Sequence, residues 1–343
     1  MPTDVNIILT LFLMILGAAI LITGGETFVR GATRIAAILR IPTLIVGLTI
    51  VSAATSAPEL SVSLTGVLGK TPNPDIAVGN VVGSNIANIL LILGISAFVR
   101  PLAVSSGLTK REIPMMIVFS FLLWGIGLFS VRPGNGAGSL HRFPFGAALL
   151  FVALLIGYNV FIVKEAQRRR NREIAGQIAE QTQTREKLPG GFTGLFVAFL
   201  FLAAGLVMLV FGSNLFVTEA KIVAAYCGVS ELVISLTILA VGTSLPELVV
   251  GLVAVARGNV DIAVGNVVGS NIFNLLGILG ITAAAAGGLV ISNQALVYDI
   301  PIMCATSLLG GYFCITDKNL SRWEGAVLLL GYAGYLFFLA NRG

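Results

Sequence analysis

The sequence of 343 residues is poor in charge and in the side chains that carry most enzyme chemistry. Only 11% of the residues are charged, and the chain has a single histidine, His141, and three isolated cysteines. The cysteines show no CxxC spacing, so the sequence predicts neither a metal cluster nor a disulfide framework. Zinc, redox and histidine-based acid–base chemistry lose support for the same reason. We therefore expect no enzyme and no resident cofactor.

The chain is rich in long apolar segments. Hydrophobic residues make up 56% of it, the mean hydropathy is +0.97, and the net charge is +5. Apolar runs of about 20 residues, the length that crosses a bilayer, follow one another along the sequence. The basic balance is typical of the cytoplasmic loops of membrane proteins rather than of nucleic-acid binding. The sequence thus predicts an all-α polytopic protein embedded in the lipid bilayer.

Ten apolar segments are candidate transmembrane helices. They cover about residues 5–37, 42–69, 75–99, 111–131, 143–165, 192–223, 229–256, 261–285, 295–315 and 323–341. Only one connection, residues 167–190, is long and strongly charged, and we expect a solvated, partly helical linker. With ten spans, 16 Lys and Arg lie on the side of this linker and 5 on the other. Because basic loops stay in the cytoplasm, the linker is predicted to be cytoplasmic and both termini to face outward.

Two parts of the sequence repeat. Residues 44–60 and 232–248 agree at nine of seventeen positions, and residues 75–86 and 261–272 are identical. Such a repeat indicates that the chain consists of two related halves.

The halves, residues 1–166 and 191–343, each contain five predicted helices. An odd number of spans places the second half in the membrane upside down. The sequence therefore predicts two inverted five-helix repeats that meet at the membrane midplane, which is an architecture of transporters.

The motif TSxPE occurs once in each half, at residues 55–59 and 243–247. A glutamate near the centre of an apolar span costs about 3 kcal/mol, and here this cost arises twice. Pro58 and Pro246 lack an amide hydrogen, so each helix should break before its glutamate and free backbone carbonyls. Carboxylates, hydroxyls and carbonyls at one depth are hard ligands that suit Ca²⁺ or Na⁺. Hydrogen bonding of neutral glutamates to a neighbouring helix is the structural alternative.

The helix after each motif carries a polar stripe with a spacing of four residues. The stripe consists of Asn80, Ser84 and Asn88 in the first half, and of Asn266, Ser270 and Asn274 in the second. On a helix that is otherwise Val, Ile and Leu, such a stripe must face protein or water. Ion binding and interhelical hydrogen bonding are both open explanations.

The blocks LTIVSAATSAPEL…GNVVGSNIAN and LTILAVGTSLPELV…GNVVGSNIFN resemble the two α-repeats of the calcium/cation antiporter superfamily, in its prokaryotic sodium/calcium exchanger type. The resemblance covers essentially the whole chain. It implies a secondary active antiporter of the prokaryotic plasma membrane that exchanges Ca²⁺ for Na⁺ by alternating access and functions as a monomer. It also implies that the long first and sixth helices slide across a rigid core.

The resemblance further implies the ligands of the transported ions. Ca²⁺ would be bound by Glu59 and Glu247 with the carbonyls of Thr55 and Thr243. Na⁺ sites would use Ser56, Ser244, Ser84, Ser270, the hydroxyl of Thr243 and backbone oxygens near Ser52 and Ala240, while Asn88 and Asn274 complete the centre.

The charge at the centre departs from the pattern of the superfamily. Many relatives carry an aspartate where this chain has Asn274, so Glu59 and Glu247 are the only formal charges expected there. Two charges balance one Ca²⁺, two Na⁺ or two protons, whereas a third Na⁺ would leave a buried site net positive. Three-to-one exchange is thus implied by the resemblance but disfavoured by the charge. Protons are an alternative coupling ion, and a passive cation channel is the alternative from another class.

Overall fold

The computed structural model describes residues 6–133, 139–179, 192–229, 234, 242–316 and 318–342, with the backbone alone at 131–133, 139–140 and 169–179. Eight of the described helices are long and apolar enough to cross a membrane, and the bent pair Thr43–Thr55 and Ala57–Leu68 makes a ninth. The helix Leu245–Ala256 is apolar but shorter, and residues 235–241 before it lie outside the described part. The predicted helical membrane fold is confirmed, while the number of ten spans stays a prediction.

The described elements of the second half follow one another in the same order as their counterparts in the first half. The first half has α1 (Ile7–Leu39), α2 (Thr43–Val46), η1 (Gly47–Val51), α3 (Ser52–Thr55), α4 (Ala57–Leu68), α5 (Pro74–Ala87), η2 (Asn88–Leu93), α6 (Gly94–Val99), η3 (Leu108–Glu112), α7 (Ile113–Phe129) and α8 (Phe145–Ala179). The second half has α9 (Phe192–Tyr226), α12 (Leu245–Ala256), α13 (Val260–Phe273), η5 (Asn274–Leu279), α14 (Gly280–Ala285), η6 (Ala295–Asp299), α15 (Ile300–Thr316) and α16 (Arg322–Arg342). Elements named η are π-helical turns.

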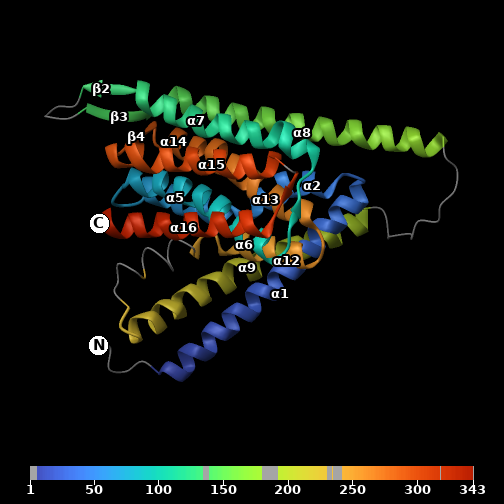
Figure 1. Cartoon of the computed structure of the whole chain (residues 1–343), viewed down its shortest axis with the longest axis horizontal. Helices are drawn as coiled ribbons and strands as arrows, with labels where there is room; N and C mark the ends of the chain where they lie inside the picture. Colours follow the sequence, from blue (N-terminus) through green and yellow to red (C-terminus); the bar gives the residue numbers. More distant parts are fainter. Residues whose placement is uncertain are drawn as a thin grey trace.

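Corresponding elements have equal lengths. α4 and α12 have 12 residues each, α5 and α13 have 14, and α7 and α15 have 17. In Figure 1, α1 begins and α16 ends at one end of the molecule, whereas α8 ends and α9 begins at the opposite end. Each half therefore begins at one end of the molecule and finishes at the other, and the two halves run in opposite directions. This is the arrangement that an inverted repeat produces.

α8 is longer than the fifth predicted segment. It continues from Phe145 to Ala179, so the first part of the charged linker 167–190 is helical. The remainder of the linker, from residue 180 on, lies outside the described residues.

Five short strands join the two halves and were not predicted from the sequence. β1 (Leu102–Ala103) pairs with β5 (Asn319–Leu320), and β2 (Val131–Pro133), β3 (Ser139–Pro144) and β4 (Gly288–Ile291) form an antiparallel sheet in that order. β1 and β3 belong to the first half, and their partners β5 and β4 to the second. Such short strands in loops carry too little alternation of polar and apolar residues to be recognised in a sequence.

α1 and α9 lie side by side and run obliquely to the other helices (Figure 1). They have 33 and 35 residues, which confirms that the first and sixth segments are longer than a bilayer requires. Glycines line the contact between them: Gly17, Gly24 and Gly31 on α1, and Gly205 and Gly212 on α9. A Cβ added to any of the five would come within 2.5–2.8 Å of the other helix. The backbones therefore touch, and the two helices form one tightly packed pair.

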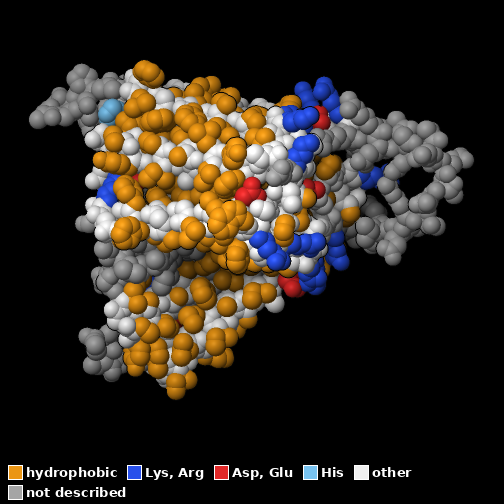
Figure 2. Space-filling view, viewed as in Figure 1, with side chains coloured by type: hydrophobic (Ala, Val, Ile, Leu, Met, Phe, Trp, Pro, Cys, Tyr) orange, Lys and Arg blue, Asp and Glu red, His pale blue; other side chains and the backbone are white. Residues whose placement is uncertain are grey.

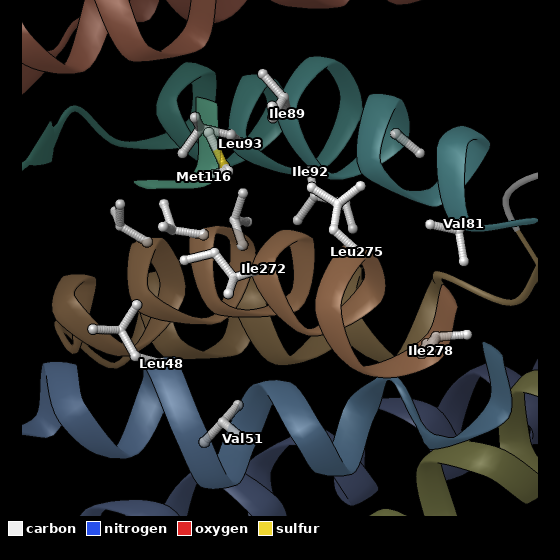
Figure 3. Close-up of a cluster of buried hydrophobic side chains, with 14 of the residues drawn as sticks. Leu48, Val51, Val81, Ile89, Ile92, Leu93, Met116, Ile272, Leu275 and Ile278 are labelled. Carbon is white, nitrogen blue, oxygen red and sulfur yellow. The ribbon is translucent and has the colours of Figure 1, made fainter. Parts of the chain in front are cut away.

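The centre of the molecule is formed by the helices that follow the two TSxPE motifs. Most residues of the spans Pro74–Val99 and Val260–Ala285 are buried, whereas less than a quarter of the most apolar part of α1, α8, α9 and α16 is buried. Figure 3 shows Ile92 of the first span beside Leu275 of the second, with Leu48 of η1 on the far side of α13. Apolar side chains also cover much of the outer surface in Figure 2, as expected where the protein contacts lipid.

The glycine contact between α1 and α9 predicts that two glycine-to-alanine substitutions differ in their effect on the Tm. Gly205→Ala places a methyl group 2.5 Å from the backbone nitrogen of Phe28, and such overpacking costs about 1–3 kcal/mol. Gly157 is an outward-facing residue of α8 with no described atom within 4 Å of an added Cβ, and alanine is favoured over glycine inside a helix. We expect Gly205→Ala to lower the Tm of the purified protein in detergent and Gly157→Ala not to lower it. Equal shifts would contradict the close contact.

Candidate functional site

The helix through the first TSxPE motif is broken. α3 ends at Thr55, α4 begins at Ala57, and the two segments meet at an angle of 41°. Ser56 lies between them with φ −84° and ψ 7°. Pro58 occupies the first turn of α4, whose N–H groups have no partner inside α4 itself, so proline is tolerated there. The break predicted before the first glutamate is confirmed.

The second motif has the same local geometry. Ser244 has φ −90° and ψ 8°, and α12 begins directly after it with Pro246 in its first turn. Because the same residues precede both glutamates, the backbone turns in the same way at the two places. Most residues of the segment before Gly242 lie outside the described part, among them the candidate ligand Ala240.

Glu59 and Glu247 are the third residues of α4 and α12, and each is only 1% exposed. Both carboxylate oxygens of Glu59 and Oε2 of Glu247 have no hydrogen-bond partner among the described residues. The helix N-termini favour negative charge at these positions. A buried carboxylate nevertheless needs a counter-charge or donors, so the two side chains form an acceptor-rich centre that suits a cation.

Contacts between the halves bring the two motifs together. The hydroxyl of Ser56 donates to Oε1 of Glu247 at 3.3 Å, and the hydroxyl of Ser244 donates to that of Ser84 at 3.4 Å. Ser56 and Ser84 belong to the first half, whereas Ser244 and Glu247 belong to the second. The fold thus makes one site out of two sequence motifs that are 188 residues apart.

The first residues of the two polar stripes take part in hydrogen bonds within the protein. Nδ2 of Asn80 donates to the carbonyl oxygen of Glu59 and to Oγ of Ser63, both at 2.9 Å. Oδ1 of Asn266 accepts from the hydroxyl of Thr55 at 3.2 Å and from that of Ser270 at 3.5 Å. Interhelical hydrogen bonding therefore explains the polar side chain of Asn80, whereas Asn266 forms one such bond and its buried Nδ2 has no partner among the described residues.

The last residues of the stripes behave differently. Asn88 and Asn274 are each 1% exposed, and their Oδ1 atoms have no hydrogen-bond partner among the described residues. Both begin a π-helical turn, η2 and η5, a distortion that is frequent at functional sites. Their Nδ2 atoms donate to Asn271 and Asn85, respectively. The sequence reasoning missed this second pair of asparagines, although both lie inside the block of twelve identical residues.

The candidate ligands are mostly gathered in the buried centre. Ten of the twelve are at most 5% exposed: Ser52, Thr55, Ser56, Glu59, Ser84, Asn88, Ser244, Glu247, Ser270 and Asn274. Thr243 is half-buried at the wall of a cavity, and Ala240 is the candidate outside the described residues.

A cavity of about 200 Å³ leads to this centre along α9. Its wall includes Ser213, Asn214, Val217 and Lys221 of α9 together with Thr243. Ser213 also donates a hydrogen bond of 3.0 Å to the carbonyl oxygen of Gly242, which is the carbonyl that Pro246 leaves without a helical donor. The cavity thus extends to Thr243 from the part of α9 that runs toward the end of the molecule where both chain termini lie (Figure 1), while Glu59 and Glu247 stay buried.

An ion pair links α1 and α12 on the other side of the α1–α9 pair. Glu26 of α1 approaches Arg257, the C-cap of α12, at 2.9 Å, and also Arg30 at 3.5 Å. The residue of α9 that corresponds to Glu26 is Asn214, which lines the cavity. The two corresponding positions thus have different surroundings.

The fold and the site together define a membrane transport protein for cations. The sequence model of the family described as "Sodium/calcium exchanger protein" matches residues 9–164 and 197–341. The sodium/calcium exchanger MaX1 of Methanosarcina acetivorans is 33% identical over an alignment of 351 positions, gaps included. This alignment covers 95% of this chain and 97% of that protein. The inner membrane protein YrbG of Escherichia coli is 38% identical over 264 residues, 77% of this chain and 76% of that protein.

Comparison with solved structures also points to the sodium/calcium exchangers. The sodium-calcium exchanger NCX_Mj, soaked with 10 mM Na⁺ and zero Ca²⁺, matches with a TM-score of 0.76 and 28% identity, and the match covers 96% of this chain and 98% of that one. The chain belongs to the sodium/calcium exchanger family, and its class is that of the cation antiporters.

The one-sided cavity predicts a difference in thiol access between two corresponding valines. Val217 lines the cavity, whereas Val29, its counterpart on α1, is 2% exposed. In a Cys227→Ser background, which removes the exposed native thiol, we expect Val217→Cys to react rapidly with a polar maleimide in detergent solution. Val29→Cys should react slowly, as is also expected of the buried native Cys304. Equal labelling of the two introduced thiols would show that both sides are open or both closed.

Proposed function

We propose that this protein exchanges Ca²⁺ for Na⁺ by alternating access, with Glu59 and Glu247 as the central cation ligands. One observation carries the proposal. Two carboxylates from the two halves are buried at one centre, and three of their four oxygens have no hydrogen-bond partner among the described residues. A divalent cation between them balances both charges, and hard oxygen ligands are those that Ca²⁺ prefers. Membership of the sodium/calcium exchanger family supports this choice of ions.

The remaining ligands are proposed around this pair. The carbonyls of Thr55 and Thr243 and the free amide oxygens of Asn88 and Asn274 add neutral oxygen ligands for Ca²⁺. The flanking Na⁺ sites use Ser56, Ser244, Ser84 and Ser270, the hydroxyl of Thr243, and the backbone near Ser52 and Ala240.

Alternating access is assigned to the α1–α9 pair. Its glycine contacts favour movement of the two helices as one unit, while the centre stays rigid because α5 and α13 are buried. In the described state the cavity along α9 is open, and Glu26 is paired with Arg257. Movement of α1 and α9 across the centre would close the cavity along α9 and separate Glu26 from Arg257.

The orientation follows from the distribution of basic residues. In Figure 2, Lys and Arg gather toward the end of the molecule at which α8 ends. We assign this end to the cytoplasm, with both termini outward. Ten spans then result if residues 229–256 form one broken span around Leu245–Ala256. The plasma membrane as location is supported by the inner membrane protein YrbG, and a monomer by a centre built within one chain.

Neutralising either glutamate is the direct test of the site. Glu59→Gln and Glu247→Gln keep the size of the side chain but remove half of the negative charge at the centre. We expect ⁴⁵Ca²⁺ uptake into proteoliposomes driven by a Na⁺ gradient to fall more than about 100-fold, beyond the roughly 10–100-fold effect of losing an outer hydrogen-bond partner. Asp75→Asn, an exposed residue in the first turn of α5, is the matched control. Wild-type transport in both glutamate variants would refute the site.

The coupling ion is tested by changing the gradient. A Na⁺ gradient at equal pH should drive Ca²⁺ into proteoliposomes, because the Ser-lined flanking positions offer neutral oxygens that suit Na⁺. A pH gradient without Na⁺ should not drive it. Uptake under the pH gradient alone would make the protein a Ca²⁺/H⁺ antiporter, and Ca²⁺ flux that needs no counter-ion would make it a channel.

A further inference from the structure

Four buried asparagines form a hydrogen-bonded group between the two halves, here called the amide clamp. It consists of Asn85 and Asn88 from the first half and Asn271 and Asn274 from the second, each at most 1% exposed. Nδ2 of Asn88 donates to Oδ1 of Asn271 at 2.9 Å, and Nδ2 of Asn274 donates to Oδ1 of Asn85 at 3.0 Å. Both bonds cross between the halves, so the clamp repeats the two-fold relation of the fold.

Backbone carbonyls fix the orientation of the two outer amides. Nδ2 of Asn271 donates to the carbonyl oxygen of Asn85 at 3.4 Å, and Nδ2 of Asn85 donates to that of Asn271 at 3.3 Å. A carbonyl oxygen can only accept, so these two amide ends must be NH₂ groups. The same nitrogens approach the sulfurs of Met116, at 3.5 Å, and Met303, at 3.7 Å, which are also acceptors.

The orientation of the inner amides follows from that of the outer ones. Because Oδ1 of Asn271 faces Asn88, only the NH₂ end of Asn88 can form the bond between them. Oδ1 of Asn88 is therefore turned away from the clamp, and it is buried without a partner among the described residues. The same holds for Asn274. Its NH₂ end donates to Oδ1 of Asn85, so its own Oδ1 is also buried without a partner among the described residues.

The freed amide oxygens lie on the helix faces that belong to the cation centre. Asn88 follows Ser84 by one turn of α5, and Ser84 accepts a hydrogen bond from Ser244 of the second motif. Residues four apart share one face of a helix. Asn274 stands in the same relation to Ser270 on α13.

We propose that Asn85 and Asn271 are positioning residues for the transported cation. They hold Asn274 and Asn88 so that an oxygen, and not an NH₂ group, is presented to the ion. A flipped amide would point a partial positive charge at the cation and set two oxygens of the clamp against each other. This proposal rests on the proposed function, because it assigns Asn88 and Asn274 as ligands of the Ca²⁺ site.

The test measures how Ca²⁺ raises the Tm of the detergent-solubilised full-length protein, since a ligand that binds the folded state stabilises it by RT ln(1 + [Ca²⁺]/Kd). The half-effective concentration is the Ca²⁺ concentration that gives a fixed rise in Tm, set at half of the largest rise measured for the wild type. Asn271→Leu removes the acceptor for Asn88 at nearly constant volume. We expect the half-effective Ca²⁺ concentration to rise by about 10–100-fold, as for other outer-shell partners of metal ligands. A merely structural role would lower the Tm without Ca²⁺ and leave the half-effective concentration unchanged, which would overturn the proposal.

A double-mutant comparison separates positioning from a general effect. If Asn271 acts through Asn88, the variant Asn271→Leu/Asn88→Leu should need no more Ca²⁺ than the worse of the two single variants. Asn85→Leu/Asn88→Leu is the matched control from a single helix: Asn85 acts through Asn274, so its effect and that of Asn88 should multiply. Multiplying effects in the first pair would contradict the clamp.

A second variant keeps the test decisive if Asn271→Leu does not fold. Asn85→Leu removes the acceptor for Asn274 in the same way, so the half-effective Ca²⁺ concentration should rise by about 10–100-fold in this variant too. An unchanged half-effective concentration in this variant would overturn the proposal. Glu59→Gln distinguishes the two levels of inference. If it abolishes the Ca²⁺ effect while the Asn271 and Asn85 variants leave it intact, the clamp fails and the proposed function stands; if it also leaves the effect intact, the proposed function fails.

Discussion

Two carboxylates that lie in an apolar interior are the constraint on which the rest of the structure depends. Burying Glu59 and Glu247 is unfavourable unless the surrounding structure supplies compensation. Each side chain is placed in the first turn of a helix, where the N-terminal dipole favours its charge. That position requires the helix to begin in the middle of a span, and Pro58 and Pro246 cause the interruption. The freed backbone is tolerated because it lines a buried polar centre rather than lipid.

The internal repeat makes the centre possible, but the two halves are not in equivalent states. Ser213 bonds the freed carbonyl of Gly242, whereas its counterpart on α1 is Gly25, which has no side chain to do so. Glu26 pairs with Arg257, while its counterpart Asn214 lines the cavity. These differences are confined to contacts of the α1–α9 pair. The amide clamp in the centre, by contrast, keeps its two-fold relation, as the proposed alternating access would require of a rigid core.

Much of the site could be predicted from the sequence because its residues follow local rules. A proline one residue before a buried glutamate predicts a broken helix, and Ser84 and Asn88 share a helix face by spacing alone. Asn85 and Asn271 were missed because they lie off that face, and their role appears only when helices from the two halves are in contact. The glycine contact of α1 and α9 was missed for the same reason: the glycines recur every seven residues, but the partner backbone is not visible in the sequence.

The sequence by itself determined the class of the protein, its inverted repeat, the helix break at the first motif, the start of α12 after Ser244 and ten of the buried polar residues. Apolar length, proline geometry and repeat register are properties of the chain and need no partner to act. Tertiary structure decided which polar atoms stay free. Hydrogen bonds between residues about 185 apart use the nitrogens of Asn88 and Asn274 and leave their oxygens without partners. It also decided where the cavity lies, because the cavity depends on how α9 packs against α4 and α12. Neither property is encoded in a single segment, since both arise only when the two halves meet.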